Sequence, residues 1–556
     1  MLNYKELLFG YWSQIYPGVS TSLLEDFLDT IDTDNPDQPS FNSIADWYKD
    51  AIVYSTYTEL FNNDFKGLID KLEYLQKLGI SCLWLLPVLS SPMRDGGFDI
   101  DNYYHIRPNL AGNAPDTDKL FADFLQKSHE YGIKVIFDIS LNHISDEHFW
   151  FKKAIKSKNN EYRDFFIWSE TSEKYNDARI IFKGIEESNW QKCGNEFYFH
   201  RFFNFQPDLN YRNPEVLLEM CRILLHWQKT GIDGFRADAT PYIWKEENTD
   251  CENLPQTHAI VKFFRAILDY VKPGTLLLAE ACQKPQKVIE YLGNGDECHA
   301  AYHFPLMPRI FKAIAEEKSD AIKETLDRAV TPKIPVNTQW FTFLRCHDEL
   351  SLELVYVSEE ERKFIHEKYC HKPEWDFRKG EGISARLAEL MQHDSRRILL
   401  AYSLILTLPG TPVIYYGDEV GKLNDEEHYR EIIKLTGKDD SRFLVRGKMD
   451  WNEIEKSLKN NESLASKVFY PLQSMMLYRN TSKVFGRGEL SFEKSTNAAL
   501  LIHSREFENH KFLFVHNLSS QNTSVDLSTF TPNKTDELQK PFDSVIEPYG
   551  FRWIKI

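Results

Sequence analysis

The chain lacks the features that mark several common classes of protein. No apolar run approaches the ~20 residues that a membrane-spanning helix needs, and the first residues do not resemble a secretory signal peptide. The formal net charge is -17, which disfavours nucleic acid and anionic membrane surfaces as partners. The eight cysteines follow no metal-binding spacing, so we interpret them as free thiols of a reducing compartment and expect a cytoplasmic protein.

Length and aromatic content are both high. The chain has 556 residues, enough for a large core and more than one domain, and it contains 12 Trp, 27 Tyr and 38 Phe. Aromatic rings stack on sugars, but they also fill large apolar cores. Composition leaves both interpretations open.

From Trp47 onward, strand-like runs alternate with amphipathic helical runs such as Phe65–Leu78, Lys119–Tyr131 and Pro214–Thr230. The strand-like runs lie near residues 51–57, 81–87, 133–138, 232–238, 275–280, 300–304, 340–346 and 412–416. Such alternation is typical of a parallel sheet covered by helices, and eight strands close a barrel. The sequence therefore predicts an α/β fold, a (β/α)8 TIM barrel.

Two long stretches interrupt the alternation, and a third follows it. Residues 144–207 predict an inserted subdomain after the third strand, within a catalytic barrel of residues 47–472. A second stretch, 351–397, is expected to form a lid. Residues 473–556 contain short alternating runs, which predict a C-terminal antiparallel β domain.

Residues 1–46 predict an N-terminal helical extension that ends in a turn-rich linker, Asp32–Ser40. The extension either packs on the barrel or mediates self-association. The sequence leaves both options open, and with them a homo-oligomer.

Four of the strand-like runs end in an acid or a histidine. The segments are Asp138–His143, Gly234–Asp238, Leu276–Glu280 and Phe343–Asp348. In a parallel barrel the C-terminal ends of the strands carry the active site. One such segment alone would fit an unrelated acid at the start of a loop, but four in order predict one site for glycoside chemistry.

A retaining glycosidase needs a carboxylate nucleophile and a carboxylic acid. We assign Asp238 as the nucleophile, and we expect Arg236, two residues earlier on the same strand face, to lower its pKa. Glu280 follows an apolar run, where desolvation would keep it protonated as the general acid. Asp348 would bind sugar hydroxyls in the transition state.

Two histidines also end these strands, His143 and His347. A lone histidine is usually structural. Because both lie at strand ends that carry the predicted site, we expect both to contact sugar hydroxyls.

These four segments resemble the α-amylase family, glycoside hydrolase family 13. The resemblance implies that Asp238 is the nucleophile, Glu280 the acid/base and Asp348 the stabiliser of the transition state. Further segments resemble the family's trehalose synthase branch, whose members interconvert maltose and trehalose in one site; they lie at 178–182, 186–190, 206–210, 251–255, 295–299 and 303–309. The resemblance implies a small α-glucoside as substrate and no organic cofactor.

The segment from Arg94 to Ile100 resembles the family's loop that grips the non-reducing end of the sugar. The resemblance implies that Asp99 pairs with Arg446 there and binds the terminal 4-hydroxyl group. An acid–arginine wall of this kind would block longer glucans.

The resemblance also implies a structural Ca²⁺ ion. Its ligands would be Asn142, Asp208 and the backbone carbonyl of Tyr242, and hard oxygen ligands suit Ca²⁺. The alternative is that Asn142 and Asp208 hold the insertion by hydrogen bonds without a metal.

The chain departs from the branch near the expected sugar site, where Phe98 replaces a tyrosine, Cys346 an asparagine and Lys448 a proline. Three functions therefore stay open. They are an intramolecular glucosyl transferase, a hydrolase acting on maltose or another α-glucoside, and a catalytically silent scaffold. All three acids are present, which favours an enzyme.

Overall fold

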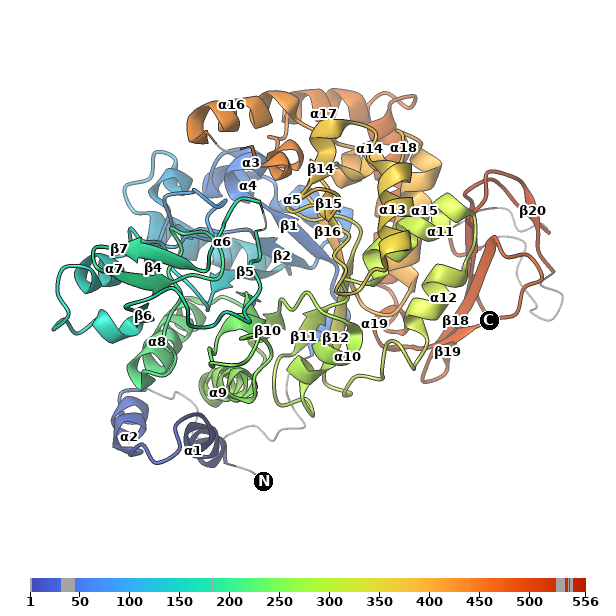
Figure 1. Cartoon of the computed structure of the whole chain (residues 1–556). Coiled ribbons are helices and arrows are strands. Elements are labelled where there is room, and N and C mark those ends of the chain that lie inside the picture. The colour runs from blue at the N-terminus through green and yellow to red at the C-terminus, as the bar shows by residue number, and fades with distance from the viewer. Residues whose placement is uncertain are drawn as a thin grey trace.

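The computed structural model describes residues 3–31, 46–182, 184–437, 439–526, 536–538, 540 and 544–556. Its centre is a closed barrel of eight parallel strands, in the order β1-β16-β12-β11-β10-β9-β5-β2 (Figure 1). The strands are β1 (Val53–Thr56), β2 (Cys82–Leu85), β5 (Lys134–Ser140), β9 (Gly234–Asp238), β10 (Leu276–Ala279), β11 (Ala300–Tyr302), β12 (Gln339–Phe343) and β16 (Thr411–Tyr415). Each overlaps one of the eight predicted runs, so the predicted TIM barrel is confirmed.

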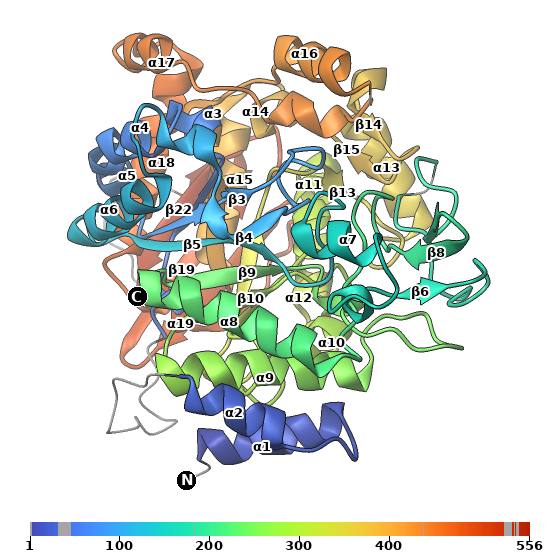
Figure 2. The ribbon, with the colours of Figure 1, turned by 90° about the vertical axis from the view of Figure 1, so that its left-hand side faces the viewer.

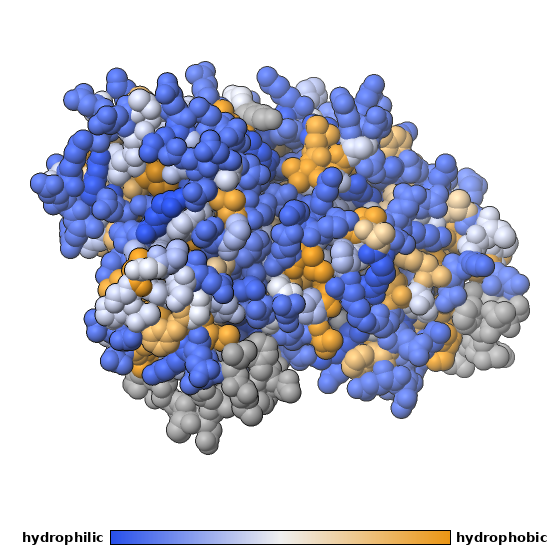
Figure 3. Space-filling model, turned by 60° about the horizontal axis from the view of Figure 1, so that its bottom comes forward, coloured by the Kyte–Doolittle hydropathy of each residue, from blue (hydrophilic) through white to orange (hydrophobic). Residues whose placement is uncertain are grey.

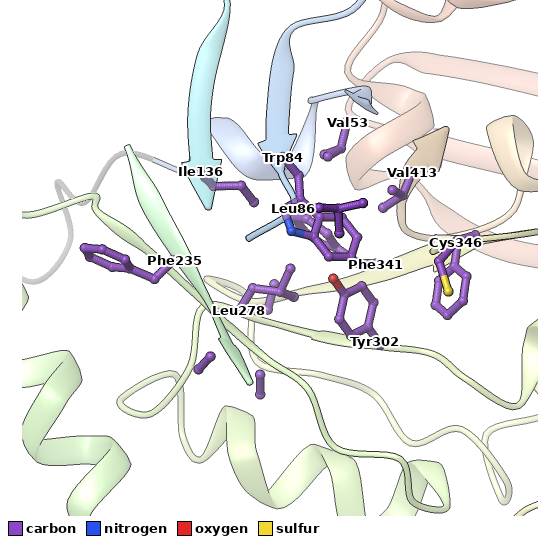
Figure 4. Packing of buried hydrophobic residues seen from close by; sticks show 14 of the residues in the cluster. Val53, Trp84, Leu86, Ile136, Phe235, Leu278, Tyr302, Phe341, Cys346 and Val413 are labelled. Atoms are coloured by element: carbon purple, nitrogen blue, oxygen red, sulfur yellow. The ribbon is translucent and has the colours of Figure 1, made fainter. Parts of the chain in front are cut away.

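The barrel strands are buried on both faces, which is why they read as almost continuous apolar runs. Figure 4 shows Val53, Leu278, Phe341 and Val413 from four different strands around the same core. The polar residues come at the strand ends, where the core stops. The interior is thus a packed core beneath the rim.

The helices that connect the strands pack around the outside of the barrel, as Figure 2 shows for α8 and α9. They are α3 (Thr58–Asn62), α4 (Phe65–Asp70), α5 (Leu72–Leu78), α6 (Thr117–Glu130), α8 (Pro214–Thr230), α9 (Pro255–Val271), α10 (Pro285–Val288), α11 (Leu306–Glu316), α12 (Asp320–Leu326) and α15 (Ser395–Thr407). Helix α8 begins where Asn213 accepts a hydrogen bond from the backbone of Glu215 and ends at Gly231, which has a φ of 110°. Both are ordinary cap signals. The predicted helix 65–78 is two helices, since α4 ends at Asp70 and α5 starts at Leu72.

An inserted subdomain follows β5, as expected. A short hairpin precedes it, made of β3 (Leu89–Ser90) and β4 (Asn102–Ile106). The insertion contains α7 (Phe149–Ala154) and a three-stranded sheet of β6 (Trp168–Ser169), β7 (Trp190–Cys193) and β8 (Glu196–Phe199). It starts and ends at an antiparallel bridge between His143 and Asp208, so its two ends meet beside the third barrel strand.

The stretch predicted as a lid has its own elements. A small sheet is formed by β13 (Leu350–Ser351), β14 (Asp376–Phe377) and β15 (Gly382–Ile383), and it is flanked by α13 (Glu359–Tyr369) and α14 (Leu387–Leu390). After β16 the chain forms α16 (Glu426–Thr436), the 3-10 turn η9 (Ser441–Val445) and α17 (Trp451–Leu458). The η9 turn brings two arginines to the rim, as described below.

The C-terminal region contains the predicted antiparallel sheet. Strands β17 (Glu489–Phe492), β18 (Leu500–Phe507), β19 (His510–Asn517) and β22 (Phe551–Lys555) pair in that order, and β20 (Thr523–Ser524) pairs with β21 (Val545–Ile546). Two helices precede the sheet, α18 (Leu464–Arg479) and α19 (Val484–Arg487). The domain boundary that we expected at residue 473 therefore falls inside α18.

The N-terminal helices α1 (Tyr4–Ile15) and α2 (Ser22–Asp29) lie beneath α8 and α9 (Figures 1 and 2). The Trp12 ring lies 6.4 Å from the Phe263 ring of α9, and the Tyr16 hydroxyl donates to the Tyr211 carbonyl oxygen at 2.8 Å. The extension thus packs on the barrel. The predicted linker Asp32–Ser40 lies outside the described residues.

No described helix is long and apolar enough to cross a membrane. The face of the molecule in Figure 3 is mostly hydrophilic, and its apolar side chains gather in separate small groups.

Candidate active site

A pocket opens at the C-terminal ends of the barrel strands. All three predicted acids line it, together with Arg236, His143 and His347. Other parts of the wall come from the insertion (Ile181, Phe182, Phe202), from the 351–397 stretch (Ser351, Glu353, Arg378) and from η9 (Arg442). The barrel thus supplies the floor, and three separate excursions of the chain supply the walls.

Arg236 holds two of the acids together. Its Nη1 atom lies 2.8 Å from Asp238 Oδ1, and its Nη2 atom donates to Glu280 Oε1. The backbone N–H of Ala239 donates to the other Glu280 oxygen at 3.4 Å. One guanidinium therefore bridges the two carboxyl groups, an arrangement that suits the close pair of a retaining enzyme.

Arg236 is itself anchored by Asp138, which the sequence did not single out as a site residue. Asp138 Oδ1 lies 2.6 Å from Arg236 Nη1, and its other oxygen accepts from the Trp84 indole at 2.8 Å. Asp138 is buried at the end of β5. It positions the guanidinium and makes no contact with the pocket of its own; its place at a strand end was the signal that could have identified it.

Burial and the neighbouring Glu280 carboxylate raise the pKa of Asp238 well above its ordinary value. Arg236 acts in the opposite direction but does not reverse the shift. Arg236 therefore lowers the pKa of Asp238, as expected, but burial and the neighbouring Glu280 outweigh it, so the net shift is upward.

Asp348 lies in the opposite electrostatic environment. Its Oδ1 atom is 3.2 Å from Arg442 Nη1 and 3.1 Å from Arg446 Nη2, and its Oδ2 atom is 3.1 Å from His347 Nε2. Although burial opposes it, the charge of His347 and the two arginines holds the pKa of Asp348 well below its ordinary value. Asp348 is thus a fixed anion at the rim.

His143 is buried and faces Asp238. Its Nε2 atom lies 4.0 Å from Asp238 Oδ2 and has no hydrogen-bond partner among the described residues. Burial lowers the pKa of His143 to about 4, so the ring is neutral at pH 7. An unpartnered ring nitrogen at the pocket wall is suited to a sugar hydroxyl.

The structure does not form the expected pair between Asp99 and Arg446. Asp99 is fully buried and accepts hydrogen bonds from Ser91 Oγ at 2.9 Å and from the Arg94 backbone at 3.1 Å. It holds the loop in shape and does not reach the pocket. Arg446 instead lies against Asp348, and its Nε atom donates to the His347 carbonyl oxygen at 2.9 Å.

An acid and an arginine do meet at the pocket wall, but they are Asp95 and Arg442. Their Oδ1 and Nη2 atoms are 3.5 Å apart, and both residues line the pocket. Gln206 of the insertion donates to the other Asp95 oxygen at 3.0 Å. Burial raises the pKa of Asp95 to about 6. Two features of the sequence could have pointed to this pair. They are the turn-forming Asp95-Gly96-Gly97 and the spacing of Arg442 and Arg446, which lie four residues apart.

An ion pair and a cation–ring contact join the insertion to the 351–397 stretch beside the pocket. Glu353 lies 3.6 Å from Arg179 Nη1 and 3.7 Å from Arg378 Nη1. Arg179 also donates to Glu252 at 2.8 Å, and the Arg378 guanidinium lies over the Phe182 ring. The insertion and the 351–397 stretch therefore contact each other at the pocket wall.

The residues expected to bind calcium do come together, but a side chain lies between them. Lys245 Nζ is 2.6 Å from Asn142 Oδ1 and 2.7 Å from Asp208 Oδ2. The Tyr242 side chain lines the pocket, and its hydroxyl accepts from Arg179 at 3.1 Å. This donor set does not fit a Ca²⁺ ion, because an ammonium group already lies between two of the ligands.

A parallel barrel with a paired nucleophile and acid at its rim and a third, fixed anion beside them defines a retaining glycoside-processing enzyme. The family model "Alpha amylase, catalytic domain" matches residues 29–372. The chain belongs to the α-amylase family.

Named relatives resemble the chain over most of its length. It is 38% identical to the trehalose synthase/amylase TreS of Mycobacterium tuberculosis over 574 residues, which cover 94% of this chain and 93% of the relative. It is 40% identical over 513 residues to a trehalose synthase of Thermus thermophilus, covering 86% of this chain and 51% of the relative.

A solved structure of a trehalulose synthase mutant in complex with Tris has the same fold. Its TM-score is 0.70 at 20% identity, and the match covers 92% of this chain and all of that one (100%).

Proposed function

We propose that the protein interconverts maltose and trehalose by moving a glucosyl group within one closed pocket. The proposal rests on one observation. The acids of a retaining site lie in a pocket whose two walls, the insertion and the 351–397 stretch, contact each other through Glu353. Support comes from the relatives, two of which are named for trehalose synthesis. The substrate would be a small α-glucoside.

In the first step the Asp238 carboxylate attacks the anomeric carbon of the substrate. A bond forms between Asp238 Oδ and that carbon while the glycosidic bond breaks, and Glu280 gives its proton to the departing oxygen. Arg236 contacts both groups, so it orients the nucleophile and the acid together. The result is a glucosyl group on Asp238 and a free glucose.

In the second step the free glucose turns and presents its anomeric hydroxyl group. Glu280, now a carboxylate, takes the proton of that hydroxyl as its oxygen attacks the glucosyl carbon and the bond to Asp238 breaks. The product is trehalose. Water taking the place of glucose gives hydrolysis instead, so the ratio of the two products depends on how well the pocket excludes water.

Asp95 and Arg442 are suited to hold the non-reducing end of the glucosyl group. Both line the pocket, and together they offer a carboxylate and five N–H donors. We assign them the role that the sequence suggested for Asp99 and Arg446. Asp348, His143 and His347 would bind the remaining hydroxyl groups, most strongly when positive charge develops on the sugar.

We also propose a reducing, cytoplasmic environment. All eight cysteines are free, as expected of such a compartment.

The test is proton NMR of the purified protein with maltose, following the anomeric signals over time. We expect the trehalose signal to grow faster than that of free glucose, and Asp238→Asn to abolish both. Glucose alone would contradict the isomerase and indicate a hydrolase. No change in the wild type would point to another α-glucoside, to be tested with sucrose and longer glucans.

A further inference from the structure

A buried polar cage lies beside the active site, where three separate segments meet. Asn142 comes from the end of β5, Asp208 from the end of the insertion, and Lys245 from the turn that follows β9. Asn142 and Asp208 are completely buried, and the Lys245 side chain is 3% exposed. All three polar groups are therefore removed from water.

The Lys245 ammonium is the central group of the cage. Oxygen atoms lie 2.6 Å away at Asn142, 2.7 Å away at Asp208 and 3.5 Å away at the Ile243 carbonyl. An ammonium group has three N–H donors and no acceptor, so three oxygens match it. Ca²⁺ needs six to eight oxygens at ~2.3–2.6 Å, and the second carboxylate oxygen of Asp208 is already taken by the Arg201 backbone N–H at 2.9 Å.

The charges of the cage also balance without a metal. Asp208 carries one negative charge, Lys245 one positive charge, and Asn142 none. A divalent cation in addition would leave two uncompensated positive charges in a buried site, which is strongly unfavourable. A buried carboxylate that lost its lysine would be unfavourable for the same reason.

We infer that Lys245 is a built-in cation that takes the place of a metal ion, so that this protein assembles its active site without calcium. The cage holds the two ends of the insertion against the barrel, where Leu209 N–H donates to the Asn142 carbonyl oxygen at 2.8 Å and His143 pairs with Asp208. His143 is the residue that faces Asp238. The ammonium therefore does the structural work that a metal could do there.

The first test uses the full-length wild type. We expect the purified protein to contain well below one equivalent of calcium per chain when its metal content is measured by mass spectrometry. We also expect the same unfolding temperature with EDTA as with added Ca²⁺. One bound equivalent, or an unfolding temperature that falls with EDTA and recovers with Ca²⁺, would overturn the inference.

The second test removes the ammonium group from the cage with the variant Lys245→Ala. Asp208 is then buried without a partner, and we expect the unfolding temperature to fall by roughly 3–4 °C. Added methylammonium or Ca²⁺ should recover part of the loss, because either can supply the missing positive charge. Lys152→Met, which removes an exposed lysine of the insertion, is the matched control and should change nothing.

An unchanged unfolding temperature in Lys245→Ala, or a loss that neither cation recovers, would show that the cage does not need a positive charge. If Lys245→Ala fails to fold, the metal content and the EDTA response of the wild type still decide the question.

Discussion

At the scale of single residues, three carboxylates with the same chemistry in water differ because of their surroundings. Asp348 faces His347 and two arginines, which hold its pKa well below the ordinary value. Asp238 shares one arginine with Glu280, and burial together with that second carboxylate raises its pKa. Asp348 is thus a constant anion, while the protonation of Asp238 depends on its burial and its neighbours.

This pairing predicts how activity depends on pH. Asp238 reacts only when ionised, and its raised pKa places the acid limb of kcat/KM above the ~3.9 of a free aspartate. Glu280→Gln removes the neighbouring negative charge, so the limb should move to lower pH. The substrate for both proteins is α-glucosyl fluoride, which leaves without an acid, and the readout is fluoride release in the first turnover.

The control for this experiment is Glu290→Gln, which changes an exposed acid outside the pocket and should leave the limb in place. A limb that stays where it is in Glu280→Gln, or that moves to higher pH, would mean that Glu280 does not raise the pKa of Asp238.

At the scale of elements, the walls of the pocket are separate excursions joined by side chains. Glu353 of the 351–397 stretch lies between Arg179 of the insertion and Arg378 beside β14. Neither excursion covers the pocket alone. Their contact is what distinguishes a closed pocket from an open cleft, and on our proposal it determines whether water competes with glucose.

We therefore predict that Glu353→Gln raises the share of hydrolysis. The side chain keeps its size but loses the charge that attracts Arg179 of the insertion, so the two walls should separate more often and admit water. We expect a ratio of glucose to trehalose several times that of the wild type, measured by NMR with maltose. Glu367→Gln, an exposed change on α13 of the same stretch, should keep the wild-type ratio. An unchanged ratio in Glu353→Gln would show that the ion pair of Glu353 does not keep water out of the pocket.

At the scale of the whole molecule, parts distant in sequence are packed into one continuous core. The cluster around the barrel includes Leu8 and Trp12 of α1 as well as Phe514 and Trp553 of the C-terminal sheet. The N-terminal helices therefore cover the outside of α9 and are integral to the fold. A homo-oligomer stays a prediction.

The whole-molecule prediction concerns Trp12, which is fully buried against α9. Trp12→Ala leaves a cavity and should cost about 3–5 kcal/mol of stability. We expect a lower unfolding temperature with an unchanged KM for maltose, because Trp12 packs against α9 on the outside of the barrel and does not line the pocket. Val19→Ala, at an exposed position, is the control. A changed KM in Trp12→Ala would link the extension to the site.

Patterns along the chain were sufficient to predict the barrel and the acids that line the pocket at its rim. Eight short apolar runs with helices between them predict a parallel barrel, and residues at the strand ends face its rim because of the fold's geometry. Asp238, Glu280 and Asp348 follow from that rule, as do Arg236, His143 and His347. Local pattern was enough here because each residue is placed by the strand that carries it.

Contacts between segments far apart in the chain became known only from the folded molecule. Asp95 rather than Asp99 meets an arginine of η9, because Asp99 is turned inward to Arg94 and the backbone of its own loop. Lys245 lies between Asn142 and Asp208, although more than 100 residues separate it from the first. Such partners, and the pKa shifts they cause, depend on distances in space that no pattern along the sequence encodes.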